Sequence, residues 1–362
     1  MYPNTIIFID REDNIDIEHK YDTWKYDLCQ DSRSHFFISI PDTWYVSDAY
    51  TNSGENTNPN ASLATFKESN SSATEIEVIE EKLQREISPE HWLNFLIEKL
   101  ERRILFSRVY EQQIGNILDC LVEDEEGKWV YRMFALKNED RILLVEARGK
   151  RDDYIERNLS EVFFMAVANF TIINPSDWAL SEPAKTYSRQ IPGDFCLIYP
   201  KSWTLREIQG CNQSDIRHLE LHNLVDDNAI GKVDFSVYKK DLEVDCYGIL
   251  DLDLEGMKAH GVQIPKLDLK EIDIDAFKNS WGTKFYIEKG KDITTDVEVE
   301  ITIGSNSDAW YVIKLLTPTR DNLPDIWSIN QTAYEIVLKW LRTPHRIQKE
   351  TQKKTTRENG QS

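Results

Sequence analysis

A strand-like apolar run followed by a proline and a tryptophan occurs twice in this chain. Residues 36–44 read FFISIPDTW and residues 195–203 read FCLIYPKSW, at an offset of 159 residues. The β-branched and aromatic positions favour a strand, and the proline ends it because its nitrogen cannot donate a hydrogen bond to a neighbouring strand. An offset of this length is typical of a duplicated domain.

The hydrophobic pattern after each copy predicts the same order of elements. Alternating positions indicate strands, and apolar residues three and four apart indicate helices. In the first half the predicted strands are 63–66, 74–79, 129–136 and 141–147 and the helices 89–104 and 154–172. In the second half the strands are 216–224, 232–238, 294–303 and 310–316 and the helices 247–259 and 324–341. We therefore expect an α+β protein of two tandem domain copies, each an antiparallel sheet with helices packed on it.

The predicted domain boundaries follow this repeat. They give an N-terminal extension at 1–34, a first repeat at 35–175, a linker at 176–193, a second repeat at 194–344 and a tail at 345–362. The extension is polar and acidic with one strand candidate at 5–9, and the charged tail is expected to be disordered. The linker holds Trp178, which is costly to expose, so we expect the linker to be docked.

Composition excludes several classes of partner. The chain has a formal charge of −20, and the tail carries five basic against two acidic residues, so the body is near −23. Such a body repels phosphate backbones, and nucleic acid is not expected as a partner. The five cysteines form no CxxC pair, which argues against a disulfide framework. With no signal peptide and no long apolar run, we expect a cytoplasmic protein without stable membrane insertion.

The sequence offers few candidates for chemistry. His218, Glu220 and His222 alternate, so on a strand they would share one face and could hold a metal. No third protein ligand is placed beside the histidines, so a solvated strand face is expected, with no metal and no cofactor. A calcium loop starting at Asp251 is rejected because Val262 stands where a glutamate is required. No phosphate loop, nucleophile elbow or HExxH motif is present, and we predict no enzyme.

The predicted strands of the two halves differ in their faces. Residues 294–303 alternate between apolar and acidic positions, which indicates a sheet with one solvated face. Residues 129–136 and 141–147 are apolar on both faces, so helices on one side would leave an apolar surface for a partner, unless the two domains or two chains cover it by packing together. By correspondence with the second half, Ile142, Leu144 and Glu146 face outward, and Arg132, which is costly to bury unpaired, assigns Val130, Phe134 and Leu136 to the same face. The predicted partner-binding residues are therefore Val130, Arg132, Phe134, Leu136, Ile142, Leu144 and Glu146. Phe134 is expected at the centre of this exposed patch.

The order of strand, Pro-x-x-Trp, strands, helix, meander and long closing helix resembles the PsbP-like fold over residues 36–175 and 195–344. The motif F-x-I-x-I-P-x-x-W at 36–44 is a marker of that fold and carries no chemistry. The superfamily includes PsbP proteins, Ran-binding import factors of Mog type, DcrB lipoproteins and the Eag-type adaptor chaperones of bacterial type VI secretion. A tandem pair without an export signal is most similar to the Eag-type adaptors.

This resemblance implies a non-catalytic adaptor or chaperone that shields apolar helices of a secreted effector for type VI secretion. The alternative is a scaffold or regulator that binds a folded basic protein through an acidic surface. Both hypotheses require a protein partner, and the sequence leaves the oligomeric state open.

Overall fold

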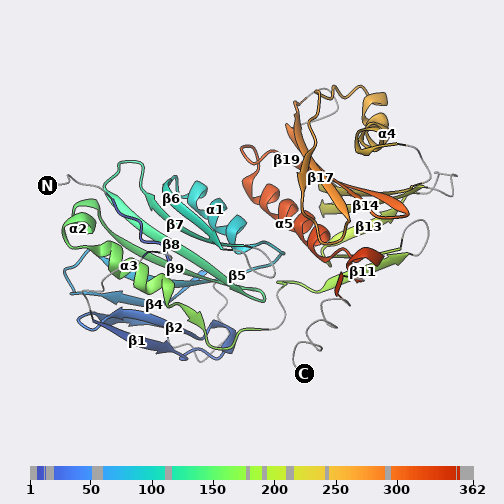
Figure 1. The fold of residues 1–362 in the computed structure, drawn as a ribbon. Helices are drawn as coiled ribbons and strands as arrows, with labels where there is room; N and C mark the ends of the chain where they lie inside the picture. The colour runs from blue at the N-terminus through green and yellow to red at the C-terminus, as the bar shows by residue number, and fades with distance from the viewer. Residues whose placement is uncertain are drawn as a thin grey trace. The chain divides into compact units, whose positions relative to one another are not determined.

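In the computed structural model the chain forms two compact units, Met1–Glu182 and Pro183–Ser362. Each unit has one seven-stranded antiparallel sheet, a smaller sheet and its own helices (Figure 1). The structure describes residues 6–11, 13, 20–50, 60–110, 116–176, 180–189, 194–208, 216–240, 244–289, 295–347, 349 and 350.

The first unit is built mainly of antiparallel strands. Its strands are β1 (Tyr21–Tyr26), β2 (Phe36–Pro41), β3 (Tyr45–Ala49), β4 (Asn60–Lys67), β5 (Glu75–Lys82), β6 (Arg103–Tyr110), β7 (Ile117–Glu123), β8 (Trp129–Asn138), β9 (Arg141–Lys150) and β10 (Thr171–Ile172). Its helices are the 3-10 turn η1 (Ser32–Ser34), α1 (Pro89–Lys99), α2 (Arg151–Glu156) and α3 (Leu159–Ala168). The large sheet has the order β3-β4-β5-β9-β8-β7-β6, and β1-β2-β10 form the small one.

The second unit has the same kind of construction. Its strands are β11 (Ala184–Arg189), β12 (Phe195–Pro200), β13 (Trp203–Glu207), β14 (Ile216–Val225), β15 (Asn228–Lys239), β16 (Lys270–Ile272), β17 (Asn279–Ile287), β18 (Val297–Ser305) and β19 (Ala309–Pro318). Its helices are α4 (Cys246–Ala259) and α5 (Pro324–Trp340). The large sheet has the order β13-β14-β15-β19-β18-β17-β16, and β11 pairs with β12.

The two large sheets correspond strand for strand, from β3 and β13 at one edge to β6 and β16 at the other. In each unit the strand with the repeated motif, β2 or β12, pairs antiparallel with the strand before it. The predicted fold class of two tandem α+β copies with antiparallel sheets is therefore confirmed. The repeated tryptophans differ in depth, since Trp203 is buried in its core and Trp44 is only partly buried against its own.

Helices cover both faces of the first unit's large sheet. Ser88 Oγ accepts a hydrogen bond from His91 N at 3.1 Å and Pro89 opens the helix, so α1 starts where the sequence predicts. The apolar face of α1 packs on one side of β7, β8 and β9. Residues of α2, α3 and β2 pack on the other side in a second cluster (Figure 1). The first unit therefore has a core on each side of its sheet.

The second unit repeats this arrangement. α5 and β12 pack on one face of its large sheet, around Phe235, Tyr311 and Ile313. α4 packs on the other face, where Leu250 and Leu254 contact the apolar side of β18. No helix in the described ranges is long and apolar enough to cross a membrane.

The acidic side of β18 lies beneath α5. Trp327 Nε1 donates a hydrogen bond to Glu298 Oε1 at 2.8 Å, and Tyr334 OH donates one to Thr302 Oγ1 at 2.8 Å. Glu298 and Thr302 are buried. The prediction that this face is solvated is wrong, because polar side chains of α5 supply the hydrogen bonds that buried polar groups need.

Several predicted elements have other limits in the structure. The helix expected at 89–104 ends at Lys99, because Glu101 takes a left-handed φ of 54° and the chain continues as β6. The helix expected at 154–172 is broken at Asn158, which has a φ of 51°. The extension contributes β1, whereas residues 6–9 form no strand. Trp178 and most of the tail lie outside the described residues.

Candidate functional site

The seven predicted partner-binding residues do not form an exposed patch. Six of them are buried within the first unit, and Leu136 is partly buried against its core. The pairs Phe134↔Val145 and Leu136↔Leu143 place these residues of β8 on the face covered by α2 and α3. Residues that pair directly across an antiparallel ladder share a face. Ile142 and Leu144 therefore point to the opposite face, under α1, and the predicted common surface of Val130, Phe134, Leu136, Ile142 and Leu144 is wrong.

Two charged residues of the predicted patch are buried in ion pairs. Arg132 donates to both carboxylate oxygens of Asp119, at 3.0 and 2.7 Å, and to the carbonyl oxygen of Ile9 at 2.9 Å. On the opposite face of the sheet, Glu146 accepts a hydrogen bond from Arg102 at 2.6 Å. The outward placement of Arg132 is wrong because Asp119 pairs with it, and the hydrophobic pattern does not predict β7, the strand that carries Asp119.

The exposed apolar surface of the first unit lies instead at an edge of the large sheet. β6 is the last strand of that sheet and pairs only with β7 among the described strands. Ile104, Phe106 and Val109 on this strand are 43%, 45% and 43% exposed, and Leu100 just before it is also exposed. In the register with β7, Ile104 and Val109 lie on the α1 side and Phe106 on the other. Within the part of the chain that the structure describes, β6 thus presents an open backbone edge with apolar side chains on both faces.

The charges along β6 are paired. Arg103 forms an ion pair with the buried Glu123 of β7, and Arg108 Nη1 lies 3.1 Å from Asp10 Oδ2. Phe106 stacks on Phe8 with ring centroids 5.9 Å apart. The edge therefore carries little unpaired charge of its own and is apolar in character.

A second candidate site is a cavity of about 1110 Å³ in the second unit. It opens on the face of the large sheet that carries α4, over β14, β15 and β19. Leu252 and Met257 of α4 and Leu316 of β19 form part of its apolar lining. The polar lining comes from alternate positions of the strands, which point to one face of a sheet.

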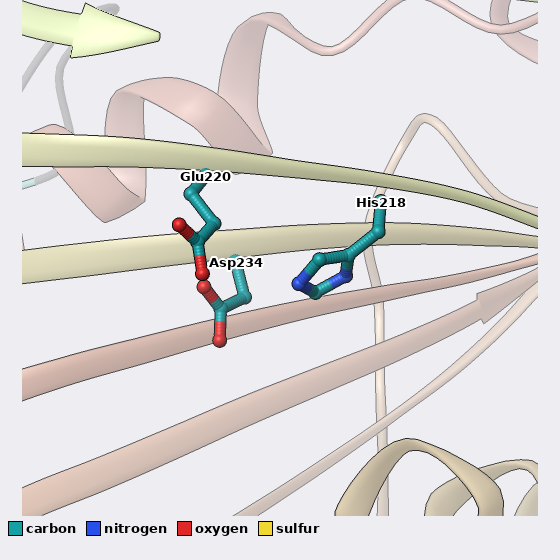
Figure 2. Close-up of side chains that lie close together, drawn as sticks. All are labelled: His218, Glu220 and Asp234. Carbon is teal, nitrogen blue, oxygen red and sulfur yellow. The ribbon is translucent and has the colours of Figure 1, made fainter. Parts of the chain in front are cut away.

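Three potential metal ligands lie together in this cavity. His218 and Glu220 are two residues apart on β14, and Asp234 of β15 is the direct register partner of Glu220. One ligand atom from each lies within 4.8 Å of the others. Figure 2 shows the His218 ring pointing toward the two carboxyl groups. The sequence signal for Asp234 is the alternation of Lys232, Asp234 and Ser236 with apolar residues along β15.

Lysine side chains neutralise part of the negative charge in the cavity. Lys232 Nζ lies 3.0 Å from both Glu220 Oε1 and Asp234 Oδ1. Lys314 Nζ donates to Asp253 Oδ2 at 2.7 Å and lies 3.6 Å from Asp234 Oδ2. Burial opposes ionisation of Glu220, but hydrogen bonds from Lys232 and His222 outweigh it and lower the pKa of this carboxyl. Glu220 is therefore ionised at neutral pH.

A hydrogen-bond chain fixes the orientation of His218. Ser236 Oγ donates to Asp253 Oδ1 at 2.9 Å, because a carboxylate can only accept. His218 Nδ1 lies 2.8 Å from Ser236 Oγ and must therefore donate to it, which leaves the lone pair of the neutral ring on Nε2. In a nucleophilic triad the histidine stands between serine and carboxylate and accepts the hydroxyl proton. Here the serine stands in the middle, so His218 does not activate it.

Comparisons with known proteins add little to this geometry. No family model matches the chain, and no curated protein matches its sequence. The solution structure of PsbP (CyanoP) from Synechocystis sp. PCC 6803 is similar at 8% identity and a TM-score of 0.32, over 44% of this chain and 96% of that chain.

The immunity protein TplEi of the type VI secretion system from Pseudomonas aeruginosa is similar in two structures. The apo form has 11% identity and a TM-score of 0.22, over 89% of this chain and 97% of that one. The form complexed with the "L" peptide has 8% identity and a TM-score of 0.23, over 89% and 98%. Likenesses with TM-scores this low carry no argument about function. The fold and the two candidate sites define a tandem α+β protein with an open strand edge in one unit and a polar cavity in the other.

Proposed function

We propose that this chain is a non-catalytic binding protein that receives an extended segment of a partner protein along the outer edge of β6. The observation that carries the proposal is the open edge with exposed Ile104, Phe106 and Val109. Unpaired backbone groups of an edge strand recruit another strand, in which main-chain hydrogen bonds supply affinity and side chains supply specificity. A segment with apolar residues on both faces fits this edge.

The charge of the first unit favours a basic partner. Residues 1–182 carry 19 basic and 35 acidic side chains, a net charge of −16. Such a field attracts a segment rich in lysine or arginine and increases its association rate. We therefore expect the bound segment to combine apolar positions with a net positive charge.

The adaptor form of this proposal makes the partner a secreted effector of a bacterial type VI secretion system, bound in the cytoplasm before export. It rests on the resemblance of the tandem pair of PsbP-like copies to the Eag-type adaptors. Both faces of the first unit's large sheet are covered by helices in the described residues. The apolar segment would accordingly be shielded at the β6 edge and not on a sheet face.

Charged substitutions at the edge test the proposal. Ile104→Lys with Val109→Lys should reduce partner binding at least about tenfold without lowering the melting temperature, because both residues are exposed and charges at an edge oppose strand addition. Leu28→Lys with Tyr45→Lys is the control with the same added charge, since both residues are exposed in the same unit and lie outside β6. Binding is measured by titrating the co-expressed products of neighbouring genes that carry apolar segments. Unchanged binding by the double variant would overturn the proposal.

The alternative scaffold role is distinguished by salt. If a folded basic protein binds only through the acidic surface, its affinity should fall steeply as salt rises to about 0.5 M, because exposed charges are screened. Binding at the apolar edge should retain most of its affinity at the same salt concentration. If the wild-type chain self-associates and the double variant is monomeric, β6 is an interface between two copies of this chain, which contradicts the partner proposal.

A further inference from the structure

We infer that His218, Glu220 and Asp234 of the second unit form a binding site for a divalent transition metal such as Zn²⁺. The two residues of β14 and the one of β15 converge in a cavity that has room for the ion and its water ligands. Histidine nitrogen and carboxylate oxygen are both established zinc ligands, and a site with three protein ligands leaves a position for water. The mixed donor set disfavours Ca²⁺ and Mg²⁺, which take oxygen ligands.

The histidine is oriented in the way that metal ligands require. Its Nδ1–H is held by Ser236, which is held in turn by Asp253, so the lone pair is on Nε2. Figure 2 shows a ring nitrogen of His218 directed toward Glu220 and Asp234. A ligating histidine commonly donates its second N–H to an acceptor that fixes the ring and increases its basicity. Ser236 and Asp253 are therefore positioning residues for this ligand.

A buried carboxylate oxygen of the cluster has an ammonium group as its partner. Asp234 is only 4% exposed, and its Oδ1 forms an ion pair with Lys232 Nζ at 3.0 Å. Buried carboxylate oxygens are nearly always hydrogen-bonded or bound to a cation. A metal ion between Asp234, Glu220 and His218 would replace the ammonium as the cation bound to this oxygen.

The Lys232 ammonium occupies the position between the carboxylates that the metal ion would take. Its ammonium lies 3.0 Å from Glu220 and from Asp234, so it competes with the metal for the same two carboxylates. The Lys232 side chain is 29% exposed and can turn toward solvent when a metal binds. Lys314 remains with Asp253 and does not have to move. Metal affinity should consequently increase when the Lys232 ammonium is removed.

Isothermal titration of the untagged full chain with ZnCl₂ tests the inference. The wild-type chain should bind one Zn²⁺, His218→Ala and Asp234→Asn should weaken binding at least about tenfold, and Ser236→Ala should weaken it by about tenfold. Lys232→Gln should bind Zn²⁺ about fivefold more tightly. A change in affinity of this size is expected when a partly exposed ion pair that competes with the metal is removed. His345→Ala is the control for histidine content, because His345 lies outside the cavity.

Folding of each variant is checked by circular dichroism, and Lys232→Gln keeps the test decisive if Asp234→Asn is unfolded. In ¹⁵N-histidine spectra, zinc should shift Nε2 of His218 and leave Nδ1 protonated. The inference is overturned if neither the wild-type chain nor Lys232→Gln binds Zn²⁺ more tightly than His218→Ala. It is also overturned if His345→Ala loses as much affinity as His218→Ala, since the ion would then be bound elsewhere.

Discussion

Phe134 lies in the core between β8 and α3 and is 2% exposed. A carboxylate at this position would be buried without a partner, which is among the most destabilising changes known. We predict that Phe134→Asp unfolds the first unit, whereas Phe134→Ala costs about 3 to 5 kcal/mol and leaves it folded. Urea denaturation followed by circular dichroism measures both. A Phe134→Asp melting temperature within a few degrees of wild type would instead place this residue on the surface.

Glu300 on β18 gives a prediction about pH. Burial raises the pKa of its carboxyl above the ordinary value of 4.5. The folded protein thus holds this proton more tightly than the unfolded chain does, and ionisation reduces stability as the pH rises from about 4.5 through the folded pKa. Glu300→Gln should raise the free energy of unfolding at pH 7.5 and change it little at pH 4. A variant that is less stable than wild type at pH 7.5 would contradict this assignment.

Individual residues also show where sequence reasoning reaches its limit. The rule that an unpaired arginine stays outside holds, but Arg132 is paired with Asp119, a contact that exists only once β7 and β8 are aligned. Asp234 was missed for the same reason, because it meets Glu220 across the β14–β15 register. A linear pattern identifies faces within one strand and does not identify partners across strands.

At the scale of elements, α1 starts at a side-chain cap. Ser88 Oγ accepts the hydrogen bond from His91 N, so Ser88→Ala should cost about 1 kcal/mol and Ser88→Asp should retain most of the stability. Amide hydrogen exchange of the first turn of α1 should accelerate in Ser88→Ala. If exchange there is unchanged, the cap does not stabilise the start of this helix.

The elements predicted best are those with long and regular periodicity. α4 and α5 lie close to the ranges read from helical spacing, and β8 and β9 lie where apolar runs indicate strands. β6 and β7 were not predicted. The apolar residues of β6 follow those of α1 without an obvious break, so the helix predicted from the spacing runs on to Ile104. The left-handed turn at Glu101 separates the two elements, and no glycine marks it.

At the scale of the whole molecule, each unit has buried clusters on both sides of its own sheet. We therefore predict that Met1–Glu182 and Pro183–Ser362, produced as separate fragments, each fold and unfold cooperatively. Thermal unfolding followed by circular dichroism measures this. A fragment that is unfolded by itself but folds when the other is added would show that the two units do not fold independently. The repeat in the sequence predicts two tandem copies, whereas the covering of both sheet faces could be recognised only once the helices were placed on the sheets.

If the β6 edge binds a partner strand, binding should slow the exchange of its backbone amides, and amide hydrogen exchange across the whole chain measures this. Exchange is compared for the chain alone and in complex with the co-expressed product of a neighbouring gene. We predict that amides of β6 become strongly protected in the complex, while those of β16, the equivalent edge strand of the second unit, stay unchanged. Protection confined to β16 or to other surfaces, with β6 exchanging as fast as in the unbound chain, would show that the partner does not bind at the β6 edge.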